Sequence, residues 1–357
     1  MTQNGIIAID KPEGISSAAV VAKIKKKLGL KKVGHTGTLD PFATGLMLCG
    51  INKGTKLSRF FLGSSKNYVA EVALGIGTDT QDYTGHIVKH SSPELIKAIT
   101  NQTIIESIER FKGVQMQNPP IYSALKHDGK PLYQLAREGH PVQKPPRKIQ
   151  IHSIEVQNIQ KISESEYFKN ISLPDRKFLS VDNFLSMAKF LECLSVTISI
   201  HCSSGTYIRS IAHDIGEQLG CGGCLTSLRR TRTSGFSIDD AITMSQLEGM
   251  SQEGAFTRII PMAQAVSFLP AIQADDALID IIRFGRTFRL SDTSISLSLI
   301  ESAQSEYLPS LSNEYLQLSN SNEALYMRVI GTNRELAAIV EYDRELDKYD
   351  YCCVFMN

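Results

Sequence analysis

The chain has 357 residues, 42% of them hydrophobic, which is long enough for two domains that each bury a core. Its formal net charge is +1, so the overall charge does not indicate a nucleic-acid-binding protein. No apolar run approaches the roughly 18 residues of a membrane span, no signal peptide is recognisable, and the seven cysteines are an odd number, so we expect a cytoplasmic protein with free thiols.

The first elements are expected to be a short strand and a helix. Residues 6–9 are an apolar strand candidate, and Ser16 or Ser17 can cap a helix that Gly29 ends. Residues 14–39 contain six lysines and no acid, and the lysines fall mainly on the side of the helix away from its apolar stripe. A local basic surface of this kind is typical of phosphate binding.

A loop and several short elements follow the helix. Four glycines or prolines in the thirteen residues of 33–45 predict a loop with a defined backbone path. Residues 46–51 and 68–74 are apolar and predict strands, and 93–112 carry two short helical patterns.

The middle of the chain predicts two strands joined by an unusual connection. Residues 148–156 alternate but shift phase at Ile154, whereas 194–202 alternate cleanly, and an apolar stripe over 207–219 predicts a helix. The polar stretch 157–190 lacks periodicity, so we expect an exposed insertion in a hairpin-like connection. Two further basic clusters comprise Lys144, Arg147 and Lys148, and Arg229, Arg230 and Arg232.

The C-terminal part changes character from about Phe268. It is serine-rich over 291–321 and contains strand-like runs at 325–330, 336–341 and 351–355. We therefore expect a catalytic domain over 1–265 and a small β-rich domain over 266–357.

The loop before the second strand carries the most informative carboxylate. Asp40 stands directly before Pro41 in a glycine-rich loop, and such a carboxylate can act as a nucleophile or a general base. On chemistry alone the alternative is an Asx-turn, in which Asp40 only accepts hydrogen bonds from local amides.

Ordered motifs connect this loop to a known family. The string Gly34-His-Thr-Gly-Thr-Leu-Asp-Pro-Phe-Ala-Thr-Gly-Leu46 closely resembles the signature of the tRNA pseudouridine-55 synthase family, the TruB family. Six other segments resemble family motifs and occur in the family's order, namely 10–17, 66–68, 77–85, 119–126, 201–209 and 225–231. Departures from the family pattern are Ser204, where a lysine is common, and Cys221, where many relatives have histidine.

The resemblance implies both a fold and a reaction. The fold would be α+β, with a mixed, largely antiparallel sheet in a catalytic domain of pseudouridine synthase type and a PUA-like RNA-binding domain after it. The activity would be that of an isomerase that converts uridine to pseudouridine at position 55 in the T-arm of tRNA. The N1–C1′ bond of the nucleotide breaks, the uracil turns, and C5 joins C1′.

The resemblance also assigns roles to individual residues. Asp40 would be the nucleophile or the proton-abstracting base, and the family pattern leaves that choice open. Tyr68 would stack on the flipped uracil and could move a proton, and Arg209 would pair with Asp40 and keep it ionised. The expected substrate-binding residues are His35, Tyr68, Tyr207, Leu228, Asp82 and Lys11.

Partners and cofactors follow from the reaction. No redox change occurs and no atom is added, so we expect neither a cofactor nor a metal. We also expect a monomer whose partner is tRNA and which does not bind a membrane. Cys221 and Cys224 form a CxxC pair, but one such pair is half of a zinc site and no second pair stands at the required spacing.

Three other functions fit parts of the sequence. The catalytic subunit of a guide-RNA complex shares these motifs, but such subunits usually carry basic tails, which this chain lacks. An RNA chaperone would not need the combination of Asp40, Tyr68 and Arg209. A carboxylate hydrolase would need a second catalytic acid near Asp40 in the sequence, and none is visible.

Overall fold

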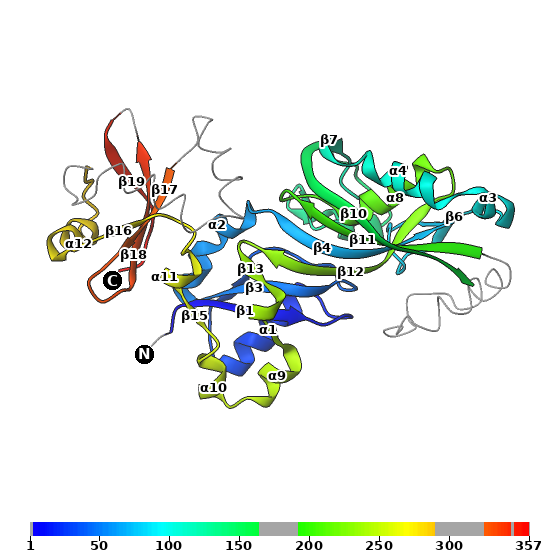
Figure 1. Ribbon diagram of the computed structural model, residues 1–357. Coiled ribbons are helices and arrows are strands. Elements are labelled where there is room, and N and C mark those ends of the chain that lie inside the picture. Colours follow the sequence, from blue (N-terminus) through cyan, green and yellow to red (C-terminus); the bar gives the residue numbers. More distant parts are fainter. Residues whose placement is uncertain (1–2, 164–191, 290–324, 344–345, 357) are drawn as a thin grey trace.

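The computed structural model describes residues 3–163, 192–289, 325–343 and 346–356. They form a long mixed sheet that runs through the molecule and a smaller sheet at one end (Figure 1). The order of the main strands is β14-β1-β3-β12-β4-β11-β10-β7, and only the β1–β14 and β3–β12 pairs are parallel. The expected α+β fold with a largely antiparallel sheet is confirmed.

The main sheet contains the strands predicted from the sequence and several more. The strands along its path are β1 (Gly5–Lys11), β3 (Thr44–Ile51), β4 (Lys66–Leu74), β7 (Gly113–Gln117), β10 (Arg147–Ser163), β11 (Glu192–Cys202), β12 (Gly223–Thr233) and β14 (Ile242–Thr243). Off this path lie β2 (Val33–His35), β13 (Phe236–Ser237) and β15 (Ile260–Pro261). Short hairpins form from β5 (Ile76–Thr78) and β6 (Ile87–His90), and from β8 (Lys126–His127) and β9 (Lys130–Pro131).

The first helix, α1 (Ser17–Leu28), has the ends that its sequence predicts. The Ser16 hydroxyl accepts a hydrogen bond from the Ala19 amide, and Gly29 closes the helix with a left-handed backbone. Ile24 and its neighbours on the apolar stripe pack against one face of β1 and β3. The helices α9 (Met244–Gly249) and α10 (Gln252–Phe256) cover the same face (Figure 1).

The other half of the sheet carries its helices on the strands β4, β10 and β11. Helix α8 (Ile208–Gln218) and helix α4 (Asn101–Glu109) pack there in one apolar cluster. The remaining helical segments are η1 (Asn52–Leu57), α2 (Ser58–Leu62), α3 (Pro93–Ala98), α5 (Leu132–Arg137), η2 (Ile238–Asp240) and α11 (Met262–Ala265).

The expected insertion is shorter at its start than the sequence suggested. Residues 157–163 belong to β10, which continues in register with β11 as a hairpin. This part of the strand showed no apolar period because most of its side chains are polar. The ladder before it is also irregular, between Ile151 and Ser153 and between Val156 and Asn158, and such irregularities change which side chains face the core. The rest of the segment, 164–191, lies outside the described residues.

The smaller sheet is formed by the C-terminal strands. Its order is β16 (Ala271–Gln273), β17 (Leu325–Ile330), β18 (Leu336–Asp343) and β19 (Lys348–Val354), with helix α12 (Asp276–Arg283) beside it. The three C-terminal strands were expected and the helix was not. The serine-rich run at 291–321 lies outside the described residues.

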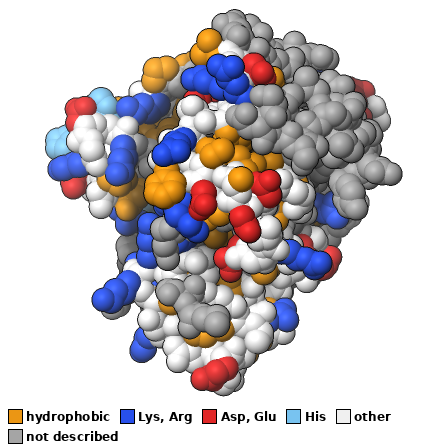
Figure 2. Space-filling model, turned by 90° about the vertical axis from the view of Figure 1, so that its left-hand side faces the viewer, with side chains coloured by type: hydrophobic (Ala, Val, Ile, Leu, Met, Phe, Trp, Pro, Cys, Tyr) orange, Lys and Arg blue, Asp and Glu red, His pale blue; other side chains and the backbone are white. Residues whose placement is uncertain are grey.

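The two sheets share an apolar core instead of being separated by a linker. Ile6 and Leu48 of the main sheet, Phe60 and Phe61 of α2, and Phe355 after β19 belong to one buried cluster. Figure 2 views the end that carries the smaller sheet and shows basic and acidic side chains intermixed on that face. The strands before about residue 265 belong to the main sheet and those after it to the smaller sheet, but the two sheets pack against each other in one core.

Candidate active site

Arg209, at the start of α8, joins two carboxylates. Its Nε lies 2.9 Å from Asp40 Oδ2, and its Nη1 lies 3.5 Å from Asp82 Oδ2. The guanidinium also donates to the carbonyl oxygens of Thr80 (2.8 Å) and Tyr122 (2.7 Å). The Arg209 side chain is 4% exposed and that of Asp40 is 34% exposed, so a buried cation holds a carboxylate that still reaches the surface.

Side chains of Lys11 and Ser17, at the two ends of the loop between β1 and α1, form hydrogen bonds with the loop that carries Asp40. The Lys11 ammonium is fully buried and donates to the carbonyl oxygens of Pro12, Ile15 and Pro41. The Ser17 hydroxyl both donates to the Leu39 carbonyl and accepts from the Leu39 amide, each at 2.9 Å. The backbone on both sides of Asp40 is therefore held by side chains from another segment.

Tyr83 closes the loop on the other side. Its ring packs edge to face on Phe42, with the ring centroids 5.7 Å apart, and its hydroxyl donates to Glu13. Because Glu13 and Phe42 belong to the two loops just described, Tyr83 connects both of them to the turn that carries Asp82.

Burial shifts the pKa values of two residues near Asp40, raising that of Tyr68 and lowering that of Lys11. Desolvation lowers the pKa of Lys11 to about 8, against an opposing effect from Asp40. Desolvation raises the pKa of Tyr68, and Arg230 opposes that rise through its charge and a hydrogen bond to the hydroxyl. At neutral pH Tyr68 therefore keeps its proton and Lys11 its charge.

Asp82 is held by Arg209 and by its own turn. It accepts hydrogen bonds from the hydroxyls of Thr80 and Thr84 and from the Thr84 amide. Burial raises the pKa of Asp82, while Arg209 and the two hydroxyls lower it. Asp82 was expected among the substrate-binding residues, and in the described structure its side chain contacts Arg209 and the two threonines.

Two other candidates lie at the edge of this group. Leu228 on β12 is buried in the cluster that contains Leu39, Phe42 and Tyr68. For His35 on β2, burial lowers the pKa of the imidazole, and the nearby charge of Arg230 lowers it further. A neutral imidazole is therefore expected there at pH 7.

Tyr207 directly precedes α8. Its backbone exchanges two hydrogen bonds with the side-chain amide of Gln117, and the guanidinium of Arg147 lies over its ring. Tyr207 is partly exposed at the start of the helix that carries Arg209.

Sequence reasoning missed the residues that fix the site. Arg230 is 2% exposed, and its guanidinium donates to the carbonyl oxygens of Leu46 and Gly37. Gly45 allows the backbone of Arg230 to lie close against β3, since a Cβ at Gly45 would lie 2.3 Å from the Arg230 carbonyl oxygen and the φ of Gly45 is +103°. Gln117, Thr80 and Tyr122 were also missed, because backbone carbonyls and side-chain amides carry no signal in a single sequence.

The predicted basic surface is partly used inside the protein. Lys23 pairs with Glu248 of α9, and Lys27 donates to the carbonyl oxygens of Glu248 and Met250. Arg229 forms two hydrogen bonds with Asp10. Fewer lysines and arginines of these clusters are therefore free to bind phosphate than their number in the sequence suggested.

The cysteines do not assemble with other ligands. Cys221 and Cys224 are buried, and the part of the chain that the structure describes holds no group of three or more histidine, cysteine or acidic residues that could bind a metal ion. Within the same residues, no helix is long and apolar enough to span a membrane.

Family models match most of the chain. The model described as the TruB family pseudouridylate synthase N-terminal domain matches residues 25–208. The model described as the tRNA pseudouridylate synthase B C-terminal domain matches residues 209–267. Together they include Asp40, Tyr68 and Arg209 and end near the start of the smaller sheet.

Curated relatives agree with this match. The tRNA pseudouridine synthase B of Syntrophotalea carbinolica is 39% identical over 269 residues, which cover 75% of this chain and 76% of that protein. The tRNA pseudouridine synthase B of Desulfotalea psychrophila is 42% identical over 240 residues, which cover 67% and 85%. That of Corynebacterium jeikeium is 40% identical over 248 residues, which cover 70% and 72%.

Solved structures share the fold at lower identity. A Cbf5-Nop10-Gar1 complex contains a chain with a TM-score of 0.60 and 23% identity, covering 99% of this chain and 86% of that one. An H/ACA RNP bound to a substrate RNA containing 2'-deoxyuridine gives a TM-score of 0.61 and 23% identity, covering 100% and 86%. At this identity the likeness concerns the fold, including the smaller C-terminal sheet.

Proposed function

The chain belongs to the TruB family of pseudouridylate synthases, and from that premise we propose that it converts the uridine at position 55 in the T-arm of tRNA, with Asp40 as the catalytic carboxylate. Its relatives make it an isomerase that acts on uridine in tRNA. The position in the tRNA and the reacting carboxylate are the parts that we propose.

The single observation that carries the assignment of Asp40 is its pairing with Arg209. Among the carboxylates that Arg209 contacts, Asp40 is partly exposed and Asp82 is buried, so only Asp40 is open to a substrate. A carboxylate that is held in place by a guanidinium and accessible can attack C1′ or remove a proton from the ribose. The choice between these two steps stays open.

The other side chains suit the remaining steps of the reaction. When the N1–C1′ bond breaks, the uracil must turn before C5 joins C1′, and the proton on C5 must then leave while N1 gains one. Tyr68 would stack on the uracil and, as a protonated phenol, could take part in that exchange. Tyr207 and Leu228 would contact the base from either side, and His35 would stack where the base had been.

We propose the division of labour between the two sheets as well. Residues 1–265 would contain all groups that act on the uridine, and residues 266–357 would form a PUA-like module that adds contacts to the tRNA backbone. We propose that the protein acts as a monomer, in the cytoplasm, without a metal.

The test is to incubate the full chain with an unmodified tRNA transcript and to map pseudouridine at nucleotide resolution, with no guide RNA present. The expected result is one pseudouridine, in the T-loop. A hairpin that contains only the T-arm should also be converted. Conversion that requires an added guide RNA, or tRNA binding with no pseudouridine at any position, would contradict the proposal.

A further inference from the structure

Arg147, the first residue of β10, lies over an aromatic ring and close to a glycine turn. Its Cζ is 4.5 Å from the centroid of the Tyr207 ring. A Cβ built on Gly205 would lie 3.2 Å from the same Cζ, and Gly205 has a φ of +80°. A residue larger than glycine would therefore both strain the turn and crowd the guanidinium.

A partner on the neighbouring strand fixes this arrangement. Arg147 is paired with Gln117 in the register of β10 and β7. The Gln117 side chain donates to the Tyr207 carbonyl (2.9 Å) and accepts from the Tyr207 amide (2.8 Å). Two residues that face each other across the strands thus hold Tyr207 by its backbone and by its ring, two positions before Arg209.

Arg147 carries a charge that no acidic residue in the described part of the chain neutralises. No acidic side chain lies within ion-pair distance of it among the residues that the structure describes, and its buried Nε has no hydrogen-bond partner there. In this it differs from Arg209 and Arg229, which pair with Asp40 and Asp10. An arginine that lies over an aromatic ring and has no acidic partner among the described residues suits a phosphate group, whose oxygens accept two parallel hydrogen bonds from a guanidinium.

We propose that Arg147 is a substrate-positioning residue, which binds a backbone phosphate beside the flipped uridine while its stacking on Tyr207 holds that ring in place. This inference rests on the proposed function, because it needs an RNA whose target base lies near Tyr207. Arg147 acts on the position of the nucleotide and not on the bonds that break and form.

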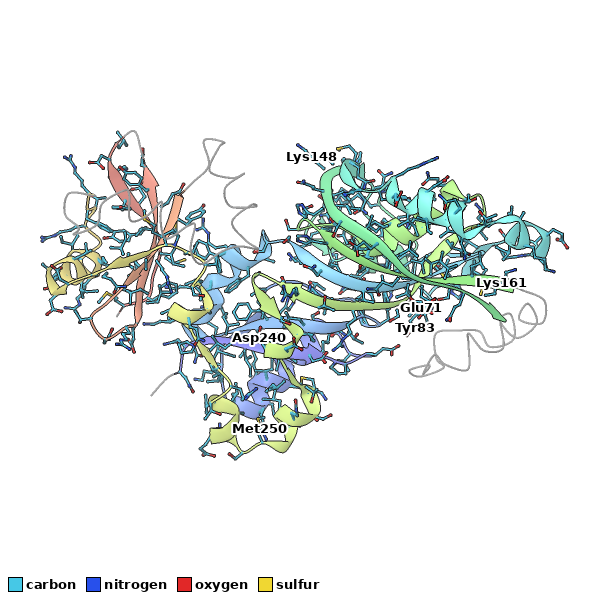
Figure 3. All side chains as sticks on the ribbon, in the orientation of Figure 1. Glu71, Tyr83, Lys148, Lys161, Asp240 and Met250 are labelled. Atoms are coloured by element: carbon cyan, nitrogen blue, oxygen red, sulfur yellow. The ribbon has the colours of Figure 1, made fainter. Side chains whose placement is uncertain are left out.

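The experiment compares three variants of the full chain on an unmodified tRNA transcript. Arg147→Gln removes the charge, and Arg147→Lys keeps the charge but loses the planar group. Lys161→Gln is the matched control, because Lys161 is an exposed cation on the same strand at its far end from Lys148 and Arg147 (Figure 3). The dissociation constant over a series of salt concentrations and the single-turnover rate at saturating tRNA are measured for each.

The loss of one phosphate contact has a defined signature. Arg147→Gln should weaken tRNA binding about 10-fold at moderate salt and reduce the log–log salt slope by about 0.7 to 0.9. Arg147→Lys should keep the wild-type slope with an intermediate dissociation constant. Lys161→Gln should match the wild type, and conversion by every variant at saturating tRNA should stay within about five-fold of it.

Two results would overturn the inference. An unchanged salt slope in a folded Arg147→Gln variant would mean that no phosphate is bound. If Arg147→Gln does not fold, Arg147→Lys provides the test. A salt slope below that of the wild type in Arg147→Lys, which keeps the positive charge, would mean that the weaker binding comes from lost packing and not from a lost phosphate contact. Failure of the proposed function is seen separately, because the wild-type protein would then form no pseudouridine at all.

Discussion

At the scale of single residues, the geometry of Arg209 decides how Asp40 is held. Its guanidinium contacts two carboxylates and two carbonyl oxygens, and a lysine ammonium cannot reach all four. Arg209→Lys should therefore lower the single-turnover rate by about 100-fold or more, although the positive charge is kept. The measurement is pseudouridine formation at saturating tRNA.

The control for that change is an arginine with a similar pair elsewhere. Arg283 lies 2.9 Å from Asp280 on α12, and both side chains are about half exposed. Arg283→Lys should leave the rate within about two-fold, as expected for a surface ion pair. Equal effects of the two substitutions would show that Arg209 is only a structural cation.

Two substitutions of Tyr68 distinguish a role in stacking from a role in proton transfer. Tyr68→Phe keeps the ring in a site that is 7% exposed but removes the hydroxyl that Arg230 contacts, and Tyr68→Leu removes both. If the hydroxyl moves a proton, both variants should lose about 100-fold or more in rate. If Tyr68 only stacks, the Phe variant should convert tRNA at nearly the wild-type rate, so the ratio of the two rates identifies the role.

Lys11 predicts a dependence of stability on pH. Burial lowers its pKa from 10.5 to about 8, so between these values the unfolded chain binds more protons than the folded one. The contribution of Lys11 to the free energy of unfolding should therefore rise as pH increases through that window, by at most about 1.4 kcal/mol per pH unit, and stay constant below pH 8. Denaturant unfolding of the wild type and Lys11→Met at pH 7, 8, 9 and 10 measures it, and a constant difference between the two curves would contradict it.

The sequence indicated which residues gather at the site but not how they are connected. Asp40, Tyr68 and Arg209 stand in motifs whose order could be read directly. The carbonyl oxygens of Thr80 and Tyr122 that orient Arg209 could not be predicted, because any residue type supplies a carbonyl. Arg230 was counted as surface charge, since burial of an arginine depends on segments distant in sequence.

At the scale of elements, the sequence correctly predicted features that depend only on residues adjacent in the chain. The capping serine and the terminal glycine of α1, and the phase shift at Ile154 in β10, correspond to a side-chain cap, a left-handed residue and an irregularity in the ladder. Helix α12 was missed among strand-like runs. The second half of β10 was missed because its side chains are polar, and the partner strand that forms the ladder is far along the chain.

Helix α2 connects the smaller sheet with the strand of Tyr68. Phe60 packs edge to face on Tyr326 of β17, with the ring centroids 5.5 Å apart, and the chain leaves α2 directly into β4. The carbonyl of Phe61 accepts from the Ser234 hydroxyl beyond β12. Packing at the C-terminal sheet is therefore transmitted to the segment from which Tyr68 extends.

At the scale of the whole molecule, this shared core predicts that the two sheets unfold together. Phe60→Ala should lower the free energy of unfolding by about 3 kcal/mol, because it leaves a cavity in the cluster between them. Combined with Tyr326→Ala in a double-mutant cycle, it should show a coupling energy of about 1 kcal/mol. Urea unfolding followed by circular dichroism provides both values, and purely additive effects would mean that the sheets are energetically separate.

The same core limits what a shortened chain can show. A chain that ends near residue 265 would uncover Leu57, Phe60 and Phe61, so its loss of tRNA affinity would mix lost contacts with lost stability. Substitutions in the full chain are therefore the better way to assign RNA contacts to the C-terminal sheet.

The most direct test of the whole account is single-turnover conversion of tRNA by Asp40→Asn. Asparagine keeps the size of the side chain and its contact with Arg209 but cannot act as a carboxylate. The account predicts a rate at least about 1,000-fold below the wild type, with the tRNA dissociation constant within about three-fold of it. Pseudouridine formation by Asp40→Asn at a rate near that of the wild type would contradict the claim that this carboxylate performs the reaction.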